Sequence, residues 1–407
     1  MKHATTSRLL AGATTAVLAA GGVAATGTAA HAAAQPYFTY TNGWRVDQHE
    51  RELADVNGDG RDDIVGFGNA GTYVALGRTD RTFSAPERAL DSFGVQQGWR
   101  VGQHPRELAD VNGDGNADIV GFGNAGTYVA YGRTDGAFTQ PELELSSFGS
   151  DQGWDEDQHL RVLGDLNGDG NADIVGFGNA GTYVAYGRTE GGFTEPELEL
   201  SSFGSDQGWN EEQYPRVLGD LNGDGNADIV GFGNAGTYVS YGRADNTLST
   251  AELKVRDFGY QQGWRVHQHP RELADVNGDG IDDVVGFGYA GTHVAHGRAD
   301  GTFTSAGLKV RDFGYQQGWR VEHHPRGLTD ANGDNRADIV GFGNAGTHVA
   351  YGQAGGGFTG GALWLREFGR DQGWRVEHHP RELADVNGDN RAEVVGFGYS
   401  QTFVEML

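Results

Sequence analysis

Residues 55–67 of this chain read Asp-Val-Asn-Gly-Asp-Gly-Arg-Asp-Asp-Ile-Val-Gly-Phe. The motif Asp-x-Asn-Gly-Asp recurs every 55 residues, beginning at Asp55, Asp110, Asp165, Asp220, Asp275, Asp330 and Asp385. Tryptophan recurs in the same register, at Trp44, Trp99, Trp154, Trp209, Trp264, Trp319 and Trp374. Because nothing is inserted between these anchors, we expect the structure to repeat with the sequence.

Each 55-residue unit has the pattern of four short strands. In the first unit we expect strands at residues 52–55, 63–67 and 72–76, and a fourth that ends at Phe93. The fourth strand is clearer in the second unit, where residues 142–145 (Glu-Leu-Glu-Leu) alternate with period two. Turns rich in Gly, Asn and Asp separate the strands and no 3.6-residue apolar stripe is present, so the fold class is all-β. Four-stranded units of this length predict a seven-bladed β-propeller, whereas a β-solenoid would have shorter repeats.

The two ends of the chain predict that the ring of blades is closed. Phe38 has the position in its unit that Phe93 has in the next, and the last unit stops at Leu407, before its own fourth strand. We therefore expect residues 36–43 to complete the blade that begins near Arg381. A blade shared between the N- and C-terminal strands hides the sheet edges that an open array would expose.

The N-terminal residues have the layout of a secretory signal. Basic residues precede a soft apolar run over residues 9–25, which ends at the small-residue site 30–32 (Ala-His-Ala). A membrane anchor is the alternative, but the run is rich in Ala, Gly and Thr and too weakly apolar. We expect residues 1–32 to be a signal peptide and residues 33–407 a single propeller. The protein is then secreted and extracellular, with no membrane span.

The composition excludes several classes of protein. Gly accounts for 69 of 407 residues, but with 9 Pro and no Gly at every third position the chain is not a collagen. The net charge of −26 repels phosphate backbones, so we expect no nucleic-acid partner. The chain has no Cys, which excludes disulfides and thiolate metal sites. We expect a monomer.

The repeated loop that starts at Asp55 predicts calcium. It offers side-chain oxygens at positions 1, 3, 5 and 9 and a glycine at position 6, and Ca²⁺ takes six to eight oxygens. An Asx-rich turn without metal is the alternative. In each of the seven loops three clustered carboxylates would repel one another without a cation, so we expect up to seven Ca²⁺ ions. The expected metal-binding residues are Asp55, Asn57, Asp59, Asp63, Asp110, Asn112, Asp114, Asp118, Asp165, Asn167, Asp169, Asp173, Asp220, Asn222, Asp224, Asp228, Asp275, Asn277, Asp279, Asp283, Asp330, Asn332, Asp334, Asp338, Asp385, Asn387, Asp389 and Glu393.

The sixth and seventh loops are the expected weak sites. Both have Asn at position 6, Asn335 and Asn390, and Asn adopts the left-handed conformation less readily than Gly. Glu393 also replaces Asp at position 9 of the seventh loop.

The loop, read as Asp-x-Asn-Gly-Asp-Gly-x-x-Asp-Ile-Val-Gly, resembles the integrin-type FG-GAP (VCBS-like) calcium-binding propeller repeats. The longer pattern is similar to the Psathyrella velutina lectin type of seven-bladed propeller; in this chain it comprises Phe258-Gly259, Gly263-Trp264, His269-Pro270-Arg271, residues 275–280 and Gly286-Phe287-Gly288. The similarity extends over essentially the whole chain after residue 32. It implies calcium in the blade loops and equivalent pockets between blades for N-acetylglucosamine-type sugars.

A recurring set of Trp, His and Arg side chains is the candidate sugar site. Sugar C–H faces stack on indole rings, and Arg and His donate to hydroxyl oxygens. Packing between blades, with Arg bound to carbonyl oxygens, is the alternative. Glu50 and Leu160 replace the Pro of the His-Pro-Arg motif, and Tyr214 replaces its His. The expected sugar-binding residues are Trp99, His104, Arg106, Trp264, His269, Arg271, Trp319, His324, Arg326, Trp374, His379 and Arg381.

Three classes of function are compatible with these features. A calcium-binding multivalent lectin with glycan partners accounts best for a ring of equal sites. An integrin-like protein-binding or adhesion propeller fits the fold but explains the aromatic repetition less well. A polysaccharide-degrading enzyme would need unique acid and base residues in one blade, and nearly every Asp belongs to a repeated loop. We therefore expect no enzyme and assign no catalytic residues.

Overall fold

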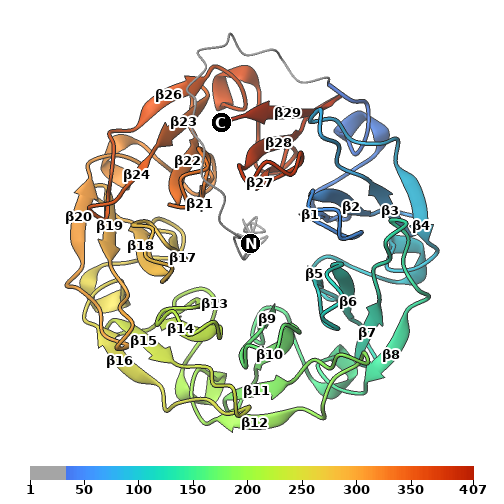
Figure 1. Ribbon diagram of the computed structural model, residues 1–407, viewed down its shortest axis with the longest axis horizontal. Coiled ribbons are helices and arrows are strands. Elements are labelled where there is room, and N and C mark those ends of the chain that lie inside the picture. Colours follow the sequence, from blue (N-terminus) through green and yellow to red (C-terminus); the bar gives the residue numbers. More distant parts are fainter. Residues whose placement is uncertain (1–33) are drawn as a thin grey trace.

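The computed structural model describes residues 34–407, which form a ring of seven blades (Figure 1). Within each blade the strands are antiparallel and follow one another in chain order. The first strand of each blade lies nearest the axis and the fourth lies at the rim (Figure 1). The predicted all-β propeller with four-stranded blades is confirmed. The predicted signal peptide, residues 1–32, lies outside the described residues.

Strands of equivalent position begin at equivalent residues, 55 positions apart throughout the described ring. The innermost strands are β1 (Arg51–Ala54), β5 (Arg106–Ala109), β9 (Arg161–Gly164), β13 (Arg216–Gly219), β17 (Arg271–Ala274), β21 (Arg326–Thr329) and β27 (Arg381–Ala384). The second strands are β2 (Asp63–Phe67), β6 (Asp118–Phe122), β10 (Asp173–Phe177), β14 (Asp228–Phe232), β18 (Asp283–Phe287), β22 (Asp338–Phe342) and β28 (Glu393–Phe397). The third strands are β3 (Thr72–Ala75), β7 (Thr127–Ala130), β11 (Thr182–Ala185), β15 (Thr237–Ser240), β19 (Thr292–Ala295), β23 (Thr347–Ala350) and β29 (Thr402–Met406). The fourth strands are β4 (Glu87–Leu90), β8 (Glu142–Leu145), β12 (Glu197–Leu200), β16 (Glu252–Val255), β20 (Gly307–Val310) and β26 (Ala362–Leu365). We number the blades 1 to 7 in this order.

Shorter elements connect the strands and the blades. A single 3₁₀ turn precedes each blade: η1 (Tyr40–Asn42), η2 (Val95–Gln97), η3 (Ser150–Gln152), η4 (Ser205–Gln207), η5 (Tyr260–Gln262), η6 (Tyr315–Gln317) and η7 (Arg370–Gln372). In blade 6 a two-stranded ribbon, β24 (Gly352–Gln353) and β25 (Gly357–Phe358), lies between the third and fourth strands. The helices of residues 34–407 are three residues long, so none of them could cross a membrane.

The core lies between blades rather than within them. The second strand is buried along its whole length, and its successive side chains face opposite neighbours. Ile64 packs with Phe397 of blade 7, whereas Val65 packs with Ile119 of blade 2. Seven apolar clusters of this kind join consecutive blades within the described residues.

The ring closes through the N-terminal segment. The backbone of Gln35 pairs with Thr402 of β29 through two hydrogen bonds of 2.9 and 2.7 Å. Gln35 occupies the place that Leu90 of β4 has opposite Thr72. The predicted blade shared between the two ends of the chain is thus confirmed. The N-terminal segment, however, adds a single β-bridge at Gln35 instead of the expected strand within residues 36–43.

Backbone hydrogen bonds between neighbouring blades also join the loops that connect the first and second strands. The backbone N–H of Ala117 donates to the carbonyl oxygen of Asp55 in the preceding blade at 2.8 Å. The same bond recurs at all seven junctions of the described ring, at 2.7–3.1 Å, including Asp62 to Asp385 across the closure. The predicted calcium loops are therefore held in a fixed order around the ring.

The Gly-Phe-Gly motif is the end of a strand followed by a turn, in agreement with the strands expected at residues 63–67 and 72–76. A Cβ at Gly66 would lie 2.5 Å from Trp44 Cη2 and 2.6 Å from Phe38 Cε1. The equivalent glycine of every blade meets the Trp or Phe ring at 2.4–2.6 Å. Glycine is required here because the Trp that precedes each blade packs directly on the backbone of the second strand.

Candidate functional site

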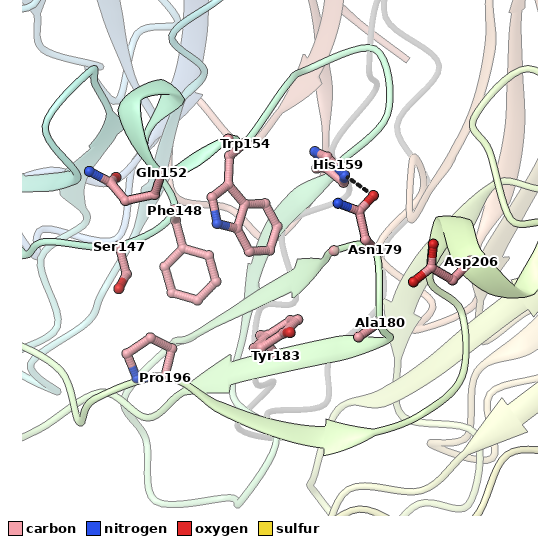
Figure 2. Close-up of a pocket in the computed structure, with 12 residues that line it drawn as sticks. Ser147, Phe148, Gln152, Trp154, His159, Asn179, Ala180, Tyr183, Pro196 and Asp206 are labelled. Atoms are coloured by element: carbon pink, nitrogen blue, oxygen red, sulfur yellow. Dashed lines mark hydrogen bonds between the residues drawn. The ribbon is translucent and has the colours of Figure 1, made fainter.

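A pocket of about 410 Å³ opens beside blade 3 (Figure 2). Trp154 and His159 come from the segment that leads into the blade, and Asn179 and Tyr183 come from the hairpin between β10 and β11. Ser147, Gln152, Pro196 and Asp206 complete much of its wall. Asp206 belongs to η4, which precedes the next blade, so the pocket is bounded by two successive connecting segments.

A second pocket, of about 340 Å³, has the same construction at blade 6. Trp319, His324 and Asn344 lie 165 residues after Trp154, His159 and Asn179. Two positions differ in chemistry, because Asp312 stands where Ser147 does and His348 where Tyr183 does. The repeat therefore produces equivalent pockets whose walls are varied at single residues.

The tryptophans form one wall while remaining largely packed. Trp154 lies against Phe148 and Tyr183, with ring centroids 4.9 and 6.1 Å away. Of the tryptophans predicted to bind sugar, Trp319 lines the described pocket at blade 6 and has only 6% of its surface exposed. Stacking on an open indole face is therefore limited, and the packing alternative accounts for most of the Trp surface.

The histidines are fixed in one tautomer. His159 Nδ1 accepts the backbone N–H of Asp155 at 3.1 Å, so its proton lies on Nε2, which donates to Asn179 Oδ1 at 2.9 Å (Figure 2). The same side-chain pair occurs at His49–Asn69, His104–Asn124 and His324–Asn344, with distances of 2.8–3.1 Å. The bond orients each Asn and leaves its amide Nδ2 group to donate to a ligand.

Burial lowers the pKa of four of the equivalent histidines, His104, His269, His324 and His379. Burial lowers the pKa of His104 and His324 below the usual value, against a smaller raising effect of the hydrogen bond to Asn. At His269 and His379 burial lowers the pKa to about 4. In those two blades a Tyr stands in place of the Asn that bonds the histidine in blades 1, 2, 3 and 6. These four histidines are therefore neutral near pH 7.

The arginines of the predicted sugar set lie in the interior. All seven equivalent arginines are 1–7% exposed, and neither described pocket has an arginine in its wall. Arg326 Nη1 donates to the carbonyl oxygen of Phe313 at 2.6 Å, and its guanidinium lies over the Phe287 ring at 5.4 Å. The predicted arginines thus make the contact expected from the packing alternative, a hydrogen bond to a carbonyl oxygen. This holds for Arg106, Arg271, Arg326 and Arg381, and none of them lies in the wall of a described pocket.

The same bond explains an error in the expected strand bounds. Phe93 adopts a left-handed backbone with φ of 60°, and the equivalent Phe does so in every blade. The carbonyl oxygen of Phe93 is then turned inward to accept Arg106 Nη1 at 2.9 Å. The fourth strand of blade 1 consequently ends at Leu90, not at Phe93 as predicted.

The loop of blade 1 is organised around its first aspartate. Asp55 Oδ1 accepts the backbone N–H of Gly58 at 2.8 Å, and Oδ2 accepts that of Gly60 at 2.7 Å. Asp63 is fully buried, and its two oxygens accept the N–H groups of Gly77 and Val56. Burial raises the pKa of Asp63 to about 8.

No group of three or more His, Asp or Glu side chains among residues 34–407 is gathered around a common metal position. The donor set of each loop nevertheless consists of carboxylate and amide oxygens alone, which suits a hard cation such as Ca²⁺. In the sixth and seventh loops the acidic residue at position 9 accepts a hydrogen bond from the Asn at position 3, Asp338 Oδ2 from Asn332 Nδ2 at 3.2 Å and Glu393 Oε1 from Asn387 Nδ2 at 2.6 Å. The predicted metal residues stay predictions.

The residues predicted to bind sugar do not include the Asn of the Gly-Phe-Gly-Asn turn or the second residue of the third strand. Asn179 and Tyr183 line the pocket of blade 3 together with the predicted type of Trp and His. Their signal was present, because Asn follows Gly-Phe-Gly in five of the seven repeats, at Asn69, Asn124, Asn179, Asn234 and Asn344.

The comparisons with known proteins agree with this architecture. The family model described as FG-GAP-like repeat matches residues 110–176 and 165–231. A lectin of Agrocybe aegerita, described as recognising non-reducing terminal N-acetylglucosamine, is 41% identical and superposes with a TM-score of 0.81. The match covers 84% of this chain and 86% of the lectin. Comparison with curated protein sequences gave no match.

Two more distant solved structures show weaker likeness. The Photorhabdus luminescens Tc holotoxin pore is 15% identical with a TM-score of 0.48, covering 82% of this chain and 16% of that one. A Bacillus licheniformis rhamnogalacturonan lyase is 13% identical with a TM-score of 0.45, covering 88% and 71%. Neither likeness bears on function. With 41% identity over most of both chains, this chain belongs to the seven-bladed β-propeller family of the Agrocybe aegerita lectin.

Proposed function

We propose that this protein is a secreted multivalent lectin that binds N-acetylglucosamine-type sugars at the pockets beside its blades. The observation that carries the proposal is the repeated pocket with a Trp wall and a His-oriented Asn donor, in a chain 41% identical to a lectin for that sugar. In each pocket the Asn Nδ2 group donates to a sugar oxygen, and the edge of the Trp contacts the apolar face of the ring. The proposed partners are glycans, bound by a monomer.

The repetition determines how such pockets would act. A single shallow site of this size should bind a monosaccharide with a Kd of about 0.1–1 mM, or about −4 to −5.5 kcal/mol. Several sites on one rigid ring then hold a glycan-coated surface far more tightly, because each later binding event is intramolecular. Multivalent binding therefore requires no strong individual pocket.

Isothermal titration with N-acetylglucosamine tests the proposal. Asn124→Ala/Asn179→Ala removes the amide donors of two blades at exposed positions, and Thr134→Ala/Thr189→Ala is the matched control on exposed turns of the same blades. We expect the Asn variant to lose about two sites of capacity while the control keeps the wild-type stoichiometry. Absence of heat in the wild type, and of retention on an immobilised-sugar column, would favour the adhesion alternative.

The proposal includes no catalysis. The pockets at blades 3 and 6 repeat Trp, His and Asn at equivalent positions, and such repetition suits several binding sites better than a single active centre. Incubation with chitin oligomers and a reducing-end assay should show no increase over the buffer control. Release of reducing ends, lost in the Asn variant, would support a polysaccharide-degrading enzyme instead.

We also propose that Ca²⁺ binds the oxygen-rich loops, up to seven per chain, and stabilises the folded ring. A ligand that binds only the folded state adds several kcal/mol at 100–1,000 times its Kd. EDTA should therefore lower the melting temperature. The Asp114→Asn variant should lose part of that EDTA-sensitive difference, and Asp389→Asn less of it, because the loop of Asp389 has Asn at position 6. Identical melting curves with and without EDTA would refute calcium binding.

A further inference from the structure

Two of the seven blades carry an exposed tyrosine where the others have the pocket Asn. Tyr289 of blade 5 and Tyr399 of blade 7 occupy the position of Asn179, which lines the pocket of blade 3. Their side chains are 61% and 62% exposed, the highest values among large hydrophobic residues of the described chain. Figure 2 shows where this position lies, at the side of the pocket between His159 and Asp206.

Each exposed tyrosine belongs to a stack. Tyr289 stacks on Tyr315 of η6 with ring centroids 6.1 Å apart and an angle of 22° between the planes. Tyr399 stacks on Tyr40 of η1 at 5.5 Å and 21°. Both planar pairs therefore combine a pocket position with the 3₁₀ turn that precedes the next blade.

The inner tyrosine of each pair is held in place by an arginine. The Arg320 guanidinium lies 3.6 Å from the centre of the Tyr315 ring, and its Nη1 donates to the Tyr315 carbonyl oxygen at 2.7 Å. Arg45 does the same at Tyr40, at 3.7 Å from the ring centre. The stacks are thus preorganised, which lowers the entropic cost of binding a ligand on them.

In blades 5 and 7, which lack the pocket Asn, the equivalent histidine keeps an unused donor. His269 and His379 accept a backbone N–H on Nδ1 at 3.2 Å, so the proton lies on Nε2. In these two side chains, both more than nine-tenths buried, Nε2 has no hydrogen-bond partner among the described residues. In blades 2 and 3, by contrast, the Asn accepts from the His and also from Ser150 or Ser205.

We propose that the Tyr289–Tyr315 and Tyr399–Tyr40 pairs are second-sugar subsites, each at the site of blade 5 or blade 7 that corresponds to the described pockets of blades 3 and 6. The inference rests on the proposed function, because it concerns the sugar linked to a terminal residue that the pocket holds. When a terminal residue occupies a pocket, the next ring of the glycan lies outside it, and a flat exposed tyrosine there stacks on the C–H face of that ring. Blades 5 and 7 therefore prefer oligosaccharides, whereas the Asn pockets bind the terminal residue alone.

The test compares N-acetylglucosamine with its β-1,4-linked trimer by isothermal titration. Tyr289→Ala/Tyr399→Ala removes both exposed rings, and Tyr289→Phe/Tyr399→Phe is the matched control that keeps the stack. We expect about a 3- to 10-fold weaker trimer affinity at two sites in the Ala variant, with unchanged monosaccharide binding and wild-type behaviour of the Phe variant.

Three outcomes would overturn the inference. An unchanged preference for the trimer in the Ala variant would remove the subsites while leaving the lectin proposal intact. A wild-type dimer in sedimentation that becomes monomeric in the Ala variant would assign the stacks to a second copy of the chain instead. Failure of the wild type to bind either sugar contradicts the lectin function itself, and with it the inference.

Discussion

At the scale of single residues, the most consequential side chain is the buried arginine of each innermost strand. Its bond to the carbonyl oxygen of the left-handed Phe is present in every blade at 2.6–3.1 Å. A bulky residue with positive φ is strained, and the charge-assisted bond offsets that strain. The arginine thus fixes the turn that places Trp on the next blade.

Replacing that arginine should destabilise the ring. Arg326→Ala leaves the Phe313 carbonyl oxygen without its donor and a space beside the Phe287 ring, so we expect a loss of about 2–4 kcal/mol. The measurement is the midpoint of urea unfolding, with the exposed Arg133→Ala as control. Equal midpoints for the two variants would contradict the structural role.

The unpaired histidines predict an acid-sensitive contribution to stability. Burial holds the pKa of His269 and His379 at about 4, below the unfolded value of about 6.5. Their contribution is complete above pH 6.5 and is lost as the pH falls towards 4, because the unfolded chain takes up the protons first. Buried Glu272 and Glu382, with pKa raised to about 8, act in the opposite sense.

Comparing a variant with the wild type separates the contribution of the two histidines to the pH dependence of stability from that of the glutamates. His269→Gln/His379→Gln does not titrate, so its melting temperature should fall less between pH 7 and pH 4.5 than that of the wild type. Calorimetry at the two pH values measures this difference. Equal falls would show that the two histidines do not contribute.

At the scale of elements, the second strand of each blade determines the packing. It is buried on both faces, and its glycine receives the Trp and Phe rings of the preceding segment. Its neighbours alternate between the two adjacent blades, so one strand belongs to two apolar clusters. Sequence reasoning found this strand because its apolar run is continuous.

Adding one methyl group to that strand should be costly. Gly121→Ala would place a Cβ 2.6 Å from both the Phe93 and the Trp99 ring, and we expect a loss of about 1–3 kcal/mol. Gly102→Ala is the matched control, since a Cβ there meets no atom within 4 Å. Calorimetry measures the melting temperatures of both variants. If Gly102→Ala is destabilised as much as Gly121→Ala, the packing argument is contradicted.

At the scale of the whole molecule, the junction of blades 7 and 1 adds the contacts of Gln35 to the apolar cluster and the Asp62–Asp385 backbone bond that it has in common with the other junctions. The backbone of Gln35 pairs with Thr402 of blade 7. Its side chain bonds the backbone of Phe83 in blade 1, donating at 2.7 Å and accepting at 2.8 Å. One residue therefore joins the two ends of the ring.

Gln35→Ala should weaken that junction specifically. It removes both side-chain bonds to Phe83 while leaving the backbone pair, and we expect about 1–3 kcal/mol less protection locally. Hydrogen exchange of β29 and of the turn at Phe83 should accelerate, while β10 and β14 exchange as in the wild type. Uniform exchange across all blades would mean that the junction is no weaker than the rest.

The sequence alone determined the number of blades, the strand order, the closure and the oxygen-rich loops, because a fixed 55-residue period allows one structural unit only. It also placed Trp and His beside the pockets. Only the tertiary structure decided which repeated residues are buried between blades and which line a pocket. It buried Arg326 and brought Asn179 and Tyr183 to the pocket wall. The period tells which residues are equivalent, but not whether their side chains point into the core or into a pocket. That orientation depends on how the neighbouring blade packs against them.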